Sequence, residues 1–113
     1  NISHSRLHTV QPLSYLEFNY LVEKAKAVIT DSGGITEEAS IMRVPCLTLR
    51  DNTERPETIS LGTNELIGTN PKNLKPYLGT LFADDWKKGN DIPLWDGNTA
   101  TRIISTITSV INK

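Results

Sequence analysis

The feature that most constrains the fold is the segment of residues 28–38, where an apolar run, a glycine pair and a helical pattern follow one another. Residues 27–30 are apolar and β-branched at their centre, which predicts a short buried strand. The run stops at the loop 31–34, after which Ile35 and Ala39 recur at helical spacing. A strand, a tight turn and a helix in this order predict one unit of an α/β protein with a parallel sheet.

The same alternation continues along the chain. Short apolar runs at residues 7–10, 46–49 and 65–67 predict further strands, the first of them near an edge. With right-handed crossovers, these units build a three-layer, Rossmann-like parallel sheet of about four strands. A sheet of this size is small for a nucleotide-binding domain, so we expect further strands upstream.

Helical spacing predicts a helix after each strand. The expected helices cover residues 15–24, 34–42, a short stretch between Pro56 and Gly62, residues 71–82 and residues 98–112. The last two are expected to bury their apolar faces, which consist of Leu74, Leu78, Leu81 and Phe82 in one and of Ile103, Ile104, Ile107 and Ile111 in the other.

Length and charge narrow the function classes. The 113 residues predict a single domain, 1–113, and twelve Lys and Arg against thirteen Asp and Glu argue against nucleic acid as a partner. No apolar run approaches the roughly 20 residues that span a bilayer. The single cysteine, Cys46, is expected to be a buried apolar residue, which fits a reducing, cytoplasmic setting. Because the first residue is Asn1 rather than Met, we expect a segment of a longer protein.

The loop 31–34 has two interpretations that the residues alone leave open. Gly33 and Gly34 let a ligand approach the backbone, and the free N–H groups of a helix start bind anions such as a diphosphate. Alternatively, Asp31 or Ser32 caps the helix and the turn is purely structural. The loop matches neither the P-loop nor the GxGxxG pattern, and we expect no metal and no cofactor.

Charged residues near this loop favour the anion interpretation slightly. Of the pair Glu37-Glu38, one carboxylate could reach past the phosphates to the two hydroxyls of a ribose. The polar loop 49–57 follows the next strand, so it emerges on the same sheet edge. In it, Arg50 or Arg55 could clamp a phosphate or hold the loop through a carboxylate, and the sequence does not choose between them.

Several separated blocks resemble one family in their residues, order and spacing. They are Thr30-Asp31-Ser32-Gly33-Gly34-Ile35, Glu37-Glu38-Ala39, Pro45, Leu49-Arg50-Asp51, Thr53-Glu54-Arg55-Pro56-Glu57, Gly62-Thr63, Leu66-Ile67-Gly68-Thr69, Asp96-Gly97 and Arg102-Ile103. Together they resemble the C-terminal segment of the non-hydrolysing UDP-N-acetylglucosamine 2-epimerases. Thr36 stands where this family often has Gln, and Trp95 replaces a usual small residue.

The resemblance implies the C-terminal, UDP-binding lobe of a two-lobed glycosyltransferase-B-like fold, truncated at its N-terminal side. Its implied UDP contacts are the backbone near Leu13 and Phe18 at the uracil, Ser32, Gly33 and Gly34 at the diphosphate, Glu38 at the ribose and Arg55 near the phosphates or sugar. For Phe18, plain core packing is an equally good interpretation.

The resemblance also implies what this segment lacks. The family interconverts UDP-GlcNAc and UDP-ManNAc by eliminating and re-adding UDP, which needs carboxylates and a histidine that lie upstream in the family. His4 and His8 do not match that histidine, so we expect no catalytic residue here. The isolated chain should be inactive and bind UDP weakly at best without its N-terminal lobe, and the full-length enzyme could be a homodimer. The alternatives are the C-lobe of a UDP-sugar glycosyltransferase and a non-catalytic nucleotide-binding module.

Overall fold

The computed structural model describes residues 2–113 and has the α/β class that the sequence predicts. Its sheet consists of β1 (Val28–Thr30), β2 (Cys46–Thr48) and β3 (Asn64–Leu66), all parallel and in the order β1-β2-β3. Because neighbouring strands are parallel, each connection has to return to the opposite edge of the sheet, and it does so by way of a helix. The carboxyl ends of all three strands therefore lie on one edge of the sheet.

The helices are close to their expected positions. They are α1 (Tyr15–Lys24), α2 (Gly33–Ile41), the short α3 (Glu57–Ser60), the 3-10 turn η1 (Pro71–Asn73), α4 (Leu74–Phe82) and α5 (Thr99–Ile111). A capping box starts α1, because the Ser14 hydroxyl accepts from the Glu17 N–H and the Glu17 carboxylate accepts from the Ser14 N–H. Arg43, with φ of 60°, ends the turn that follows α2.

The strand predicted at residues 27–30 forms as β1, but its expected burial is wrong, because β1 lies at the edge of the sheet and Ile29 is 48% exposed. The core lies instead around β2, the central strand. Cys46 and Leu47 are completely buried, and Ala39 and Val44 pack with Cys46 in one cluster. Burial raises the pKa of the Cys46 thiol to about 11, as the loss of water around a thiolate requires. Cys46 is thus the buried apolar residue that the sequence predicts.

A chain of buried polar side chains crosses the sheet. The Thr48 hydroxyl donates to the Asn64 amide oxygen at 2.6 Å, and the Asn64 amide nitrogen donates to the Thr58 hydroxyl at 3.1 Å. The Thr58 hydroxyl in turn donates to the backbone carbonyl of Arg55 at 2.7 Å. All three side chains are buried, so their polar atoms depend on these bonds. The chain fixes the backbone of Arg55 relative to β2 and β3.

Residues 7–10 do not form the expected strand. They are exposed and extended, with Leu7 at 51% and Val10 at 65% of full exposure. A strand needs a neighbour for its backbone hydrogen bonds, and within residues 2–113 the sheet pairs only β1, β2 and β3. The apolar pattern is present, but the part of the chain that the structure describes offers it no partner.

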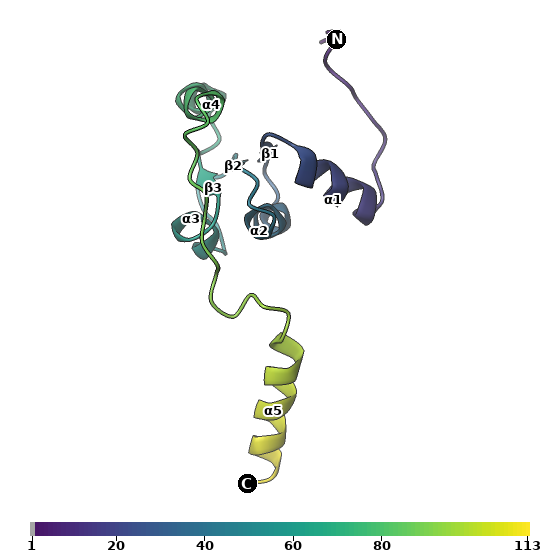
Figure 1. Ribbon diagram of the computed structural model, residues 1–113, viewed down its shortest axis with the longest axis vertical. Coiled ribbons are helices and arrows are strands. Elements are labelled where there is room, and N and C mark those ends of the chain that lie inside the picture. The colour runs from purple at the N-terminus through teal and green to yellow at the C-terminus, as the bar shows by residue number, and fades with distance from the viewer. Residues whose placement is uncertain (1) are drawn as a thin grey trace.

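The expected burial of the helix face is wrong for α5 and holds for α4 except at Phe82. Ile103, Ile104, Ile107 and Ile111 of α5 are all exposed, between 49% and 75%. Figure 1 shows α5 standing apart from the sheet at the end of the irregular segment 83–98. In α4, Leu81 is buried as expected, but Phe82 is 71% exposed. The predicted helical periodicity is correct for both helices. Within residues 2–113, however, no surface buries the isoleucines of α5 or Phe82.

Candidate functional site

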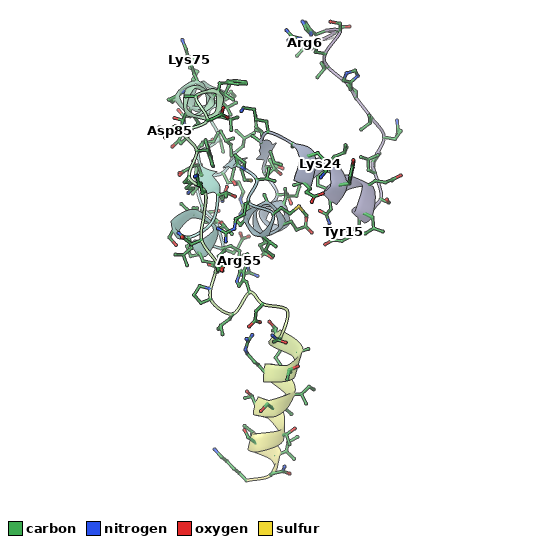
Figure 2. All side chains as sticks on the ribbon, viewed as in Figure 1. Arg6, Tyr15, Lys24, Arg55, Lys75 and Asp85 are labelled. Atoms are coloured by element: carbon green, nitrogen blue, oxygen red, sulfur yellow. The ribbon has the colours of Figure 1, made fainter. Side chains whose placement is uncertain are left out.

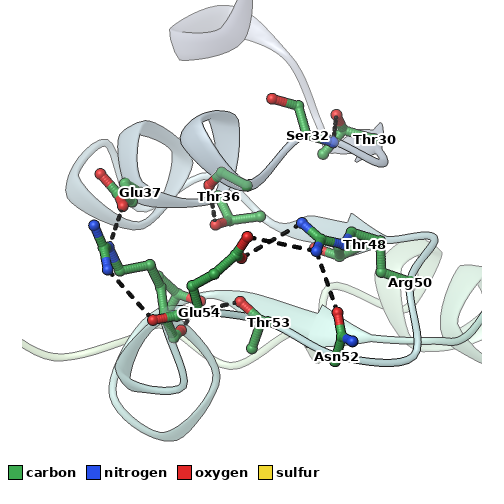
Figure 3. A network of polar contacts seen from close by, with 12 residues as sticks. Thr30, Ser32, Thr36, Glu37, Thr48, Arg50, Asn52, Thr53 and Glu54 are labelled. Atoms are coloured by element: carbon green, nitrogen blue, oxygen red, sulfur yellow. Dashed lines mark hydrogen bonds and ion pairs between the residues drawn. The ribbon is translucent and has the colours of Figure 1, made fainter.

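The loops that follow β1 and β2 meet over the start of α2, as parallel strands predict. Arg55, from the loop after β2, forms an ion pair with Glu37 on α2. Arg50, at the start of the same loop, comes close to Gly33 at the first position of α2. Figure 3 shows this network of polar contacts at the strand ends.

The first turn of α2 has no side-chain cap. Ser32 occupies the N-cap position with φ of −88° and ψ of 124°, yet its side chain makes no capping hydrogen bond. Its own N–H donates to the Thr30 hydroxyl at 3.0 Å, and Figure 3 shows the Ser32 hydroxyl directed away from the network. The cap interpretation thus fails for Ser32, and this side chain leaves the first N–H groups of the helix available.

Thr36 holds the first turn from the inside. Its hydroxyl donates to the carbonyl of Gly33 at 2.6 Å, and the side chain is 1% exposed. The sequence marked Thr36 only as a departure from the family pattern. Its buried position on the inner side of α2 gives it a structural role that the helical spacing from Ile35 to Ala39 could have indicated.

The two arginines have different partners. The bond to Glu37 is the main cause that raises the pKa of Arg55. Arg50 binds Glu54 through two contacts of 3.4 and 3.5 Å and donates to the Asn52 side-chain oxygen at 3.2 Å. A hydrogen bond with its own backbone and the charge of Arg50 lower the pKa of Glu54.

The two glutamates of α2 also differ. Glu37 is committed to Arg55, whereas Glu38 is half-buried and forms no ion pair within residues 2–113. Glu38 therefore has a carboxylate that can accept hydrogen bonds from a ligand. The structure thus separates two residues that the sequence presents as a pair.

The expected nucleotide contacts do not all share one hollow. Gly33, Gly34 and Arg55 line a depression of about 280 Å³ together with Glu37 and Glu54. Phe18 lies in a neighbouring depression of about 410 Å³, beside Thr30 at the end of β1 and Ile35 of α2. Leu13 lies apart from both, beside Leu16 and Tyr20 of α1. Gly33, Gly34 and Arg55 are therefore brought together, whereas Phe18 and Leu13 each line a separate depression.

The two histidines, a metal-binding group or a membrane-spanning helix could each indicate another function within the described part of the chain. His4 and His8 are exposed in the extended segment before α1. Among residues 2–113, no group of three His, Cys, Asp or Glu side chains is arranged to hold a metal ion. None of the helices described here has the length and apolar character needed to cross a membrane.

Known proteins resemble this chain over nearly its whole length. The family model described as UDP-N-acetylglucosamine 2-epimerase matches residues 1–108. The enzyme of that name from Methanocaldococcus jannaschii is 41% identical over 108 residues, 94% of this chain and 28% of its own length. The Bacillus subtilis enzyme is 37% identical over 106 residues, 90% of this chain and 28% of its own length.

Solved structures agree in fold. The M. jannaschii enzyme in complex with UDP-GlcNAc and UDP has a TM-score of 0.76 at 42% identity, covering 88% of this chain and 27% of that one. The Neisseria meningitidis enzyme bound to UDP-GlcNAc has a TM-score of 0.78 at 34% identity, covering 90% of this chain and 29% of that one. The chain thus spans less than a third of the length of its relatives, and within that span both sequence and fold correspond. A glycine loop, an uncapped helix start and an arginine-bearing loop on one sheet edge agree with this match: the chain belongs to the UDP-N-acetylglucosamine 2-epimerase family.

Proposed function

We propose that this chain is the UDP-binding segment of a UDP-N-acetylglucosamine 2-epimerase, and that the diphosphate lies at the start of α2. The observation that carries this proposal is the uncapped first turn at Gly33 and Gly34, beside which two arginines lie. Free N–H groups, the positive end of the helix dipole and guanidinium groups together suit a diphosphate. The bound UDP-GlcNAc of the M. jannaschii and N. meningitidis relatives supports the same ligand here.

The remaining UDP contacts follow from where the side chains lie. Ser32 has a hydroxyl without a capping role, and it can donate to a phosphate oxygen. Glu38 is the free carboxylate of α2 and suits the paired hydroxyls of the ribose. Phe18 lies beside the end of β1, where it can pack on the uracil ring, with the backbone near Leu13 reading the edge of the base.

Catalysis needs residues that this segment does not supply. We propose that the acid and base of the C2 epimerisation come from an N-terminal lobe, which closes over the sugar of UDP-GlcNAc or UDP-ManNAc. The exposed apolar faces of α1 and α5 and the outer edge of β1 support this, because they are surfaces that further parts of a longer chain could cover. We further propose that the full-length protein is a homodimer. We also propose a cytoplasmic location, because Cys46 is a buried, unpaired thiol, which fits a reducing compartment.

Two glycines provide a test of the site with a matched control. A β-carbon added at Gly34 or at Gly79 meets no atom within 4 Å, and both residues lie in helices. Alanine should therefore stabilise either helix slightly. Only Gly34 lines the proposed diphosphate site, where an added methyl group takes up the space of the ligand.

We expect Gly34→Ala to weaken UDP binding by at least roughly tenfold without lowering the melting temperature. Gly79→Ala should leave the UDP affinity unchanged. Calorimetric titration with UDP measures both. Equal affinity in the two variants would contradict the placement of the diphosphate. A parallel assay of the chain with UDP-GlcNAc should detect no C2 epimer. Turnover would contradict the proposal that the catalytic acid and base come from an N-terminal lobe.

A further inference from the structure

Resting on the proposed diphosphate site, we propose that Arg50 is a phosphate-binding residue and that Glu54 occupies the phosphate position while the protein is ligand-free. A β-carbon at Gly33 would lie 3.5 Å from Oε2 of Glu54 and 3.6 Å from Nη1 of Arg50. Both charged groups therefore lie directly against the backbone at the start of α2 (Figure 3). The carboxylate of Glu54 thus lies beside the first residue of α2, at the end of the helix where the dipole attracts an anion.

The two arginines beside this turn each face a carboxylate in the ligand-free protein. Arg50 faces Glu54 and Arg55 faces Glu37, so two cations meet two anions. A diphosphate that entered this arrangement unchanged would lie close to the carboxylate of Glu54, and the repulsion between like charges would weaken its binding. One of the carboxylates must therefore move away when the ligand binds.

The geometry indicates that Glu54 is the group that moves. Its contacts to Arg50 are 3.4 and 3.5 Å, longer than the roughly 2.9 Å of a typical hydrogen bond, and its side chain is 64% exposed. Glu37, in contrast, is anchored on α2 and bound to the Nε of Arg55. Glu54 can turn into solvent at little cost, whereas Glu37 cannot leave without breaking the contact that joins the loop to α2.

Arg50 keeps its place when Glu54 leaves. Its Nη2 also donates to the Asn52 side-chain oxygen at 3.2 Å, and its side chain is only 31% exposed. The guanidinium is thus preorganised beside Gly33 and becomes free to bind a phosphate oxygen once the carboxylate has gone. Arg55 is paired with Glu37, so it also holds the loop 50–56 over the helix.

This exchange predicts opposite effects for the two partners. Glu54→Gln removes the competing charge but keeps the size of the side chain, and it should raise the affinity for UDP roughly two- to fivefold. Arg50→Gln should lower that affinity on the order of tenfold. Uridine has no phosphate, so its affinity should not change in either variant.

The experiment is an NMR titration of the chain and its variants with UDP and with uridine, after a melting curve for each variant. Glu57→Gln is the matched control, because it removes a carboxylate from the neighbouring helix α3 that does not lie against Gly33. The inference requires that Glu54→Gln raises the affinity for UDP and that Glu57→Gln does not.

The outcomes separate the two proposals. If UDP causes no shift at Gly34 in the unsubstituted chain, the proposed site is wrong and this inference falls with it. If UDP binds there but Glu54→Gln does not raise the affinity for UDP, or Arg50→Gln does not lower it, only this inference is overturned. If Glu54→Gln raised the affinity for uridine as much as that for UDP, the inference would likewise be overturned, since the effect would not involve phosphate.

Discussion

The sheet block, residues 28–67, and helix α5 are both built from regular apolar patterns, yet only the sheet block has a buried centre, at β2; its edge strand β1 leaves Ile29 48% exposed. Leu47 at the centre of β2 is completely buried, whereas Ile107 in the middle of α5 is 49% exposed. In Figure 2 the side chains of α5 extend into open space, while those around the strands are crowded together. The difference shows that a local pattern determines which secondary structure forms, and that burial depends on a partner surface.

The largest effect is expected where the sheet block is most tightly packed. Leu47→Ala should lower the free energy of unfolding by about 2–5 kcal/mol, because it removes a completely buried side chain and leaves a cavity. Leu16→Ala, at a position that is 79% exposed, should change it by less than about 0.5 kcal/mol. Urea denaturation of both variants checks the contrast, and similar losses would remove the distinction between the buried core of the sheet block and an exposed helix face such as that of α1.

The buried polar chain of the sheet block should give the next largest effect. Asn64→Leu leaves the Thr48 hydroxyl without its acceptor, so we expect a loss of about 1–3 kcal/mol in unfolding free energy. Adding Thr48→Val in the same chain removes the unpaired hydroxyl and should restore part of the loss. If the double variant is less stable than Asn64→Leu alone, the hydrogen bond is not the cause.

The third prediction concerns α5 itself. Ile107→Ala should change the unfolding free energy of this chain by less than about 0.5 kcal/mol, because the side chain has little to lose. In a longer protein whose additional lobe covers α5, the same substitution should cost more, up to the roughly 2 kcal/mol or more of a buried isoleucine. Equal and small costs in both proteins would show that α5 remains uncovered.

The smallest effect concerns the ion pair at the start of α5. The hydrogen bond from Arg102 is the main cause that lowers the pKa of Asp96 to about 2, from an ordinary value of 3.8. Because the folded-state pKa is depressed, the stabilisation is present above pH 3.8 and is lost as the pH falls toward 2. NMR titration of the Asp96 carboxyl carbon measures this value. Arg102→Gln should return it toward about 3.9, and an unchanged pKa would exclude the pair as its cause.

The sequence predicted the sheet block well because its signals are local. Pro56 before a helix, Gly62 after it and the apolar runs of β1 and β2 each specify their structure through nearby residues. Gly62 has an additional reason that only the structure shows. A β-carbon there would lie 2.5 Å from both the Ser40 hydroxyl and the Thr58 carbonyl, so no larger residue fits.

The errors in the sequence prediction have one physical cause. Residues 7–10, Phe82 and the isoleucines of α5 carry correct patterns but lack a neighbouring surface within the described chain. In the site, the residues alone could not choose between Arg50 and Arg55 or between Glu37 and Glu38, because pairing across the strand ends depends on distances in space. Only the family resemblance named Arg55 and Glu38. The proximity of the loops after β1 and β2 could be predicted from parallel strands. Which carboxylate pairs with which arginine could not.

The central claim is that UDP binds at the start of α2 and leaves α5 untouched. Titrating the isotope-labelled chain with UDP and following its amide signals tests this directly. We expect the signals of Gly33, Gly34 and Glu38 to shift progressively and to saturate, while those of Thr99–Ile111 stay in place. The account is contradicted if the glycine and Glu38 signals stay still while signals elsewhere in the chain move.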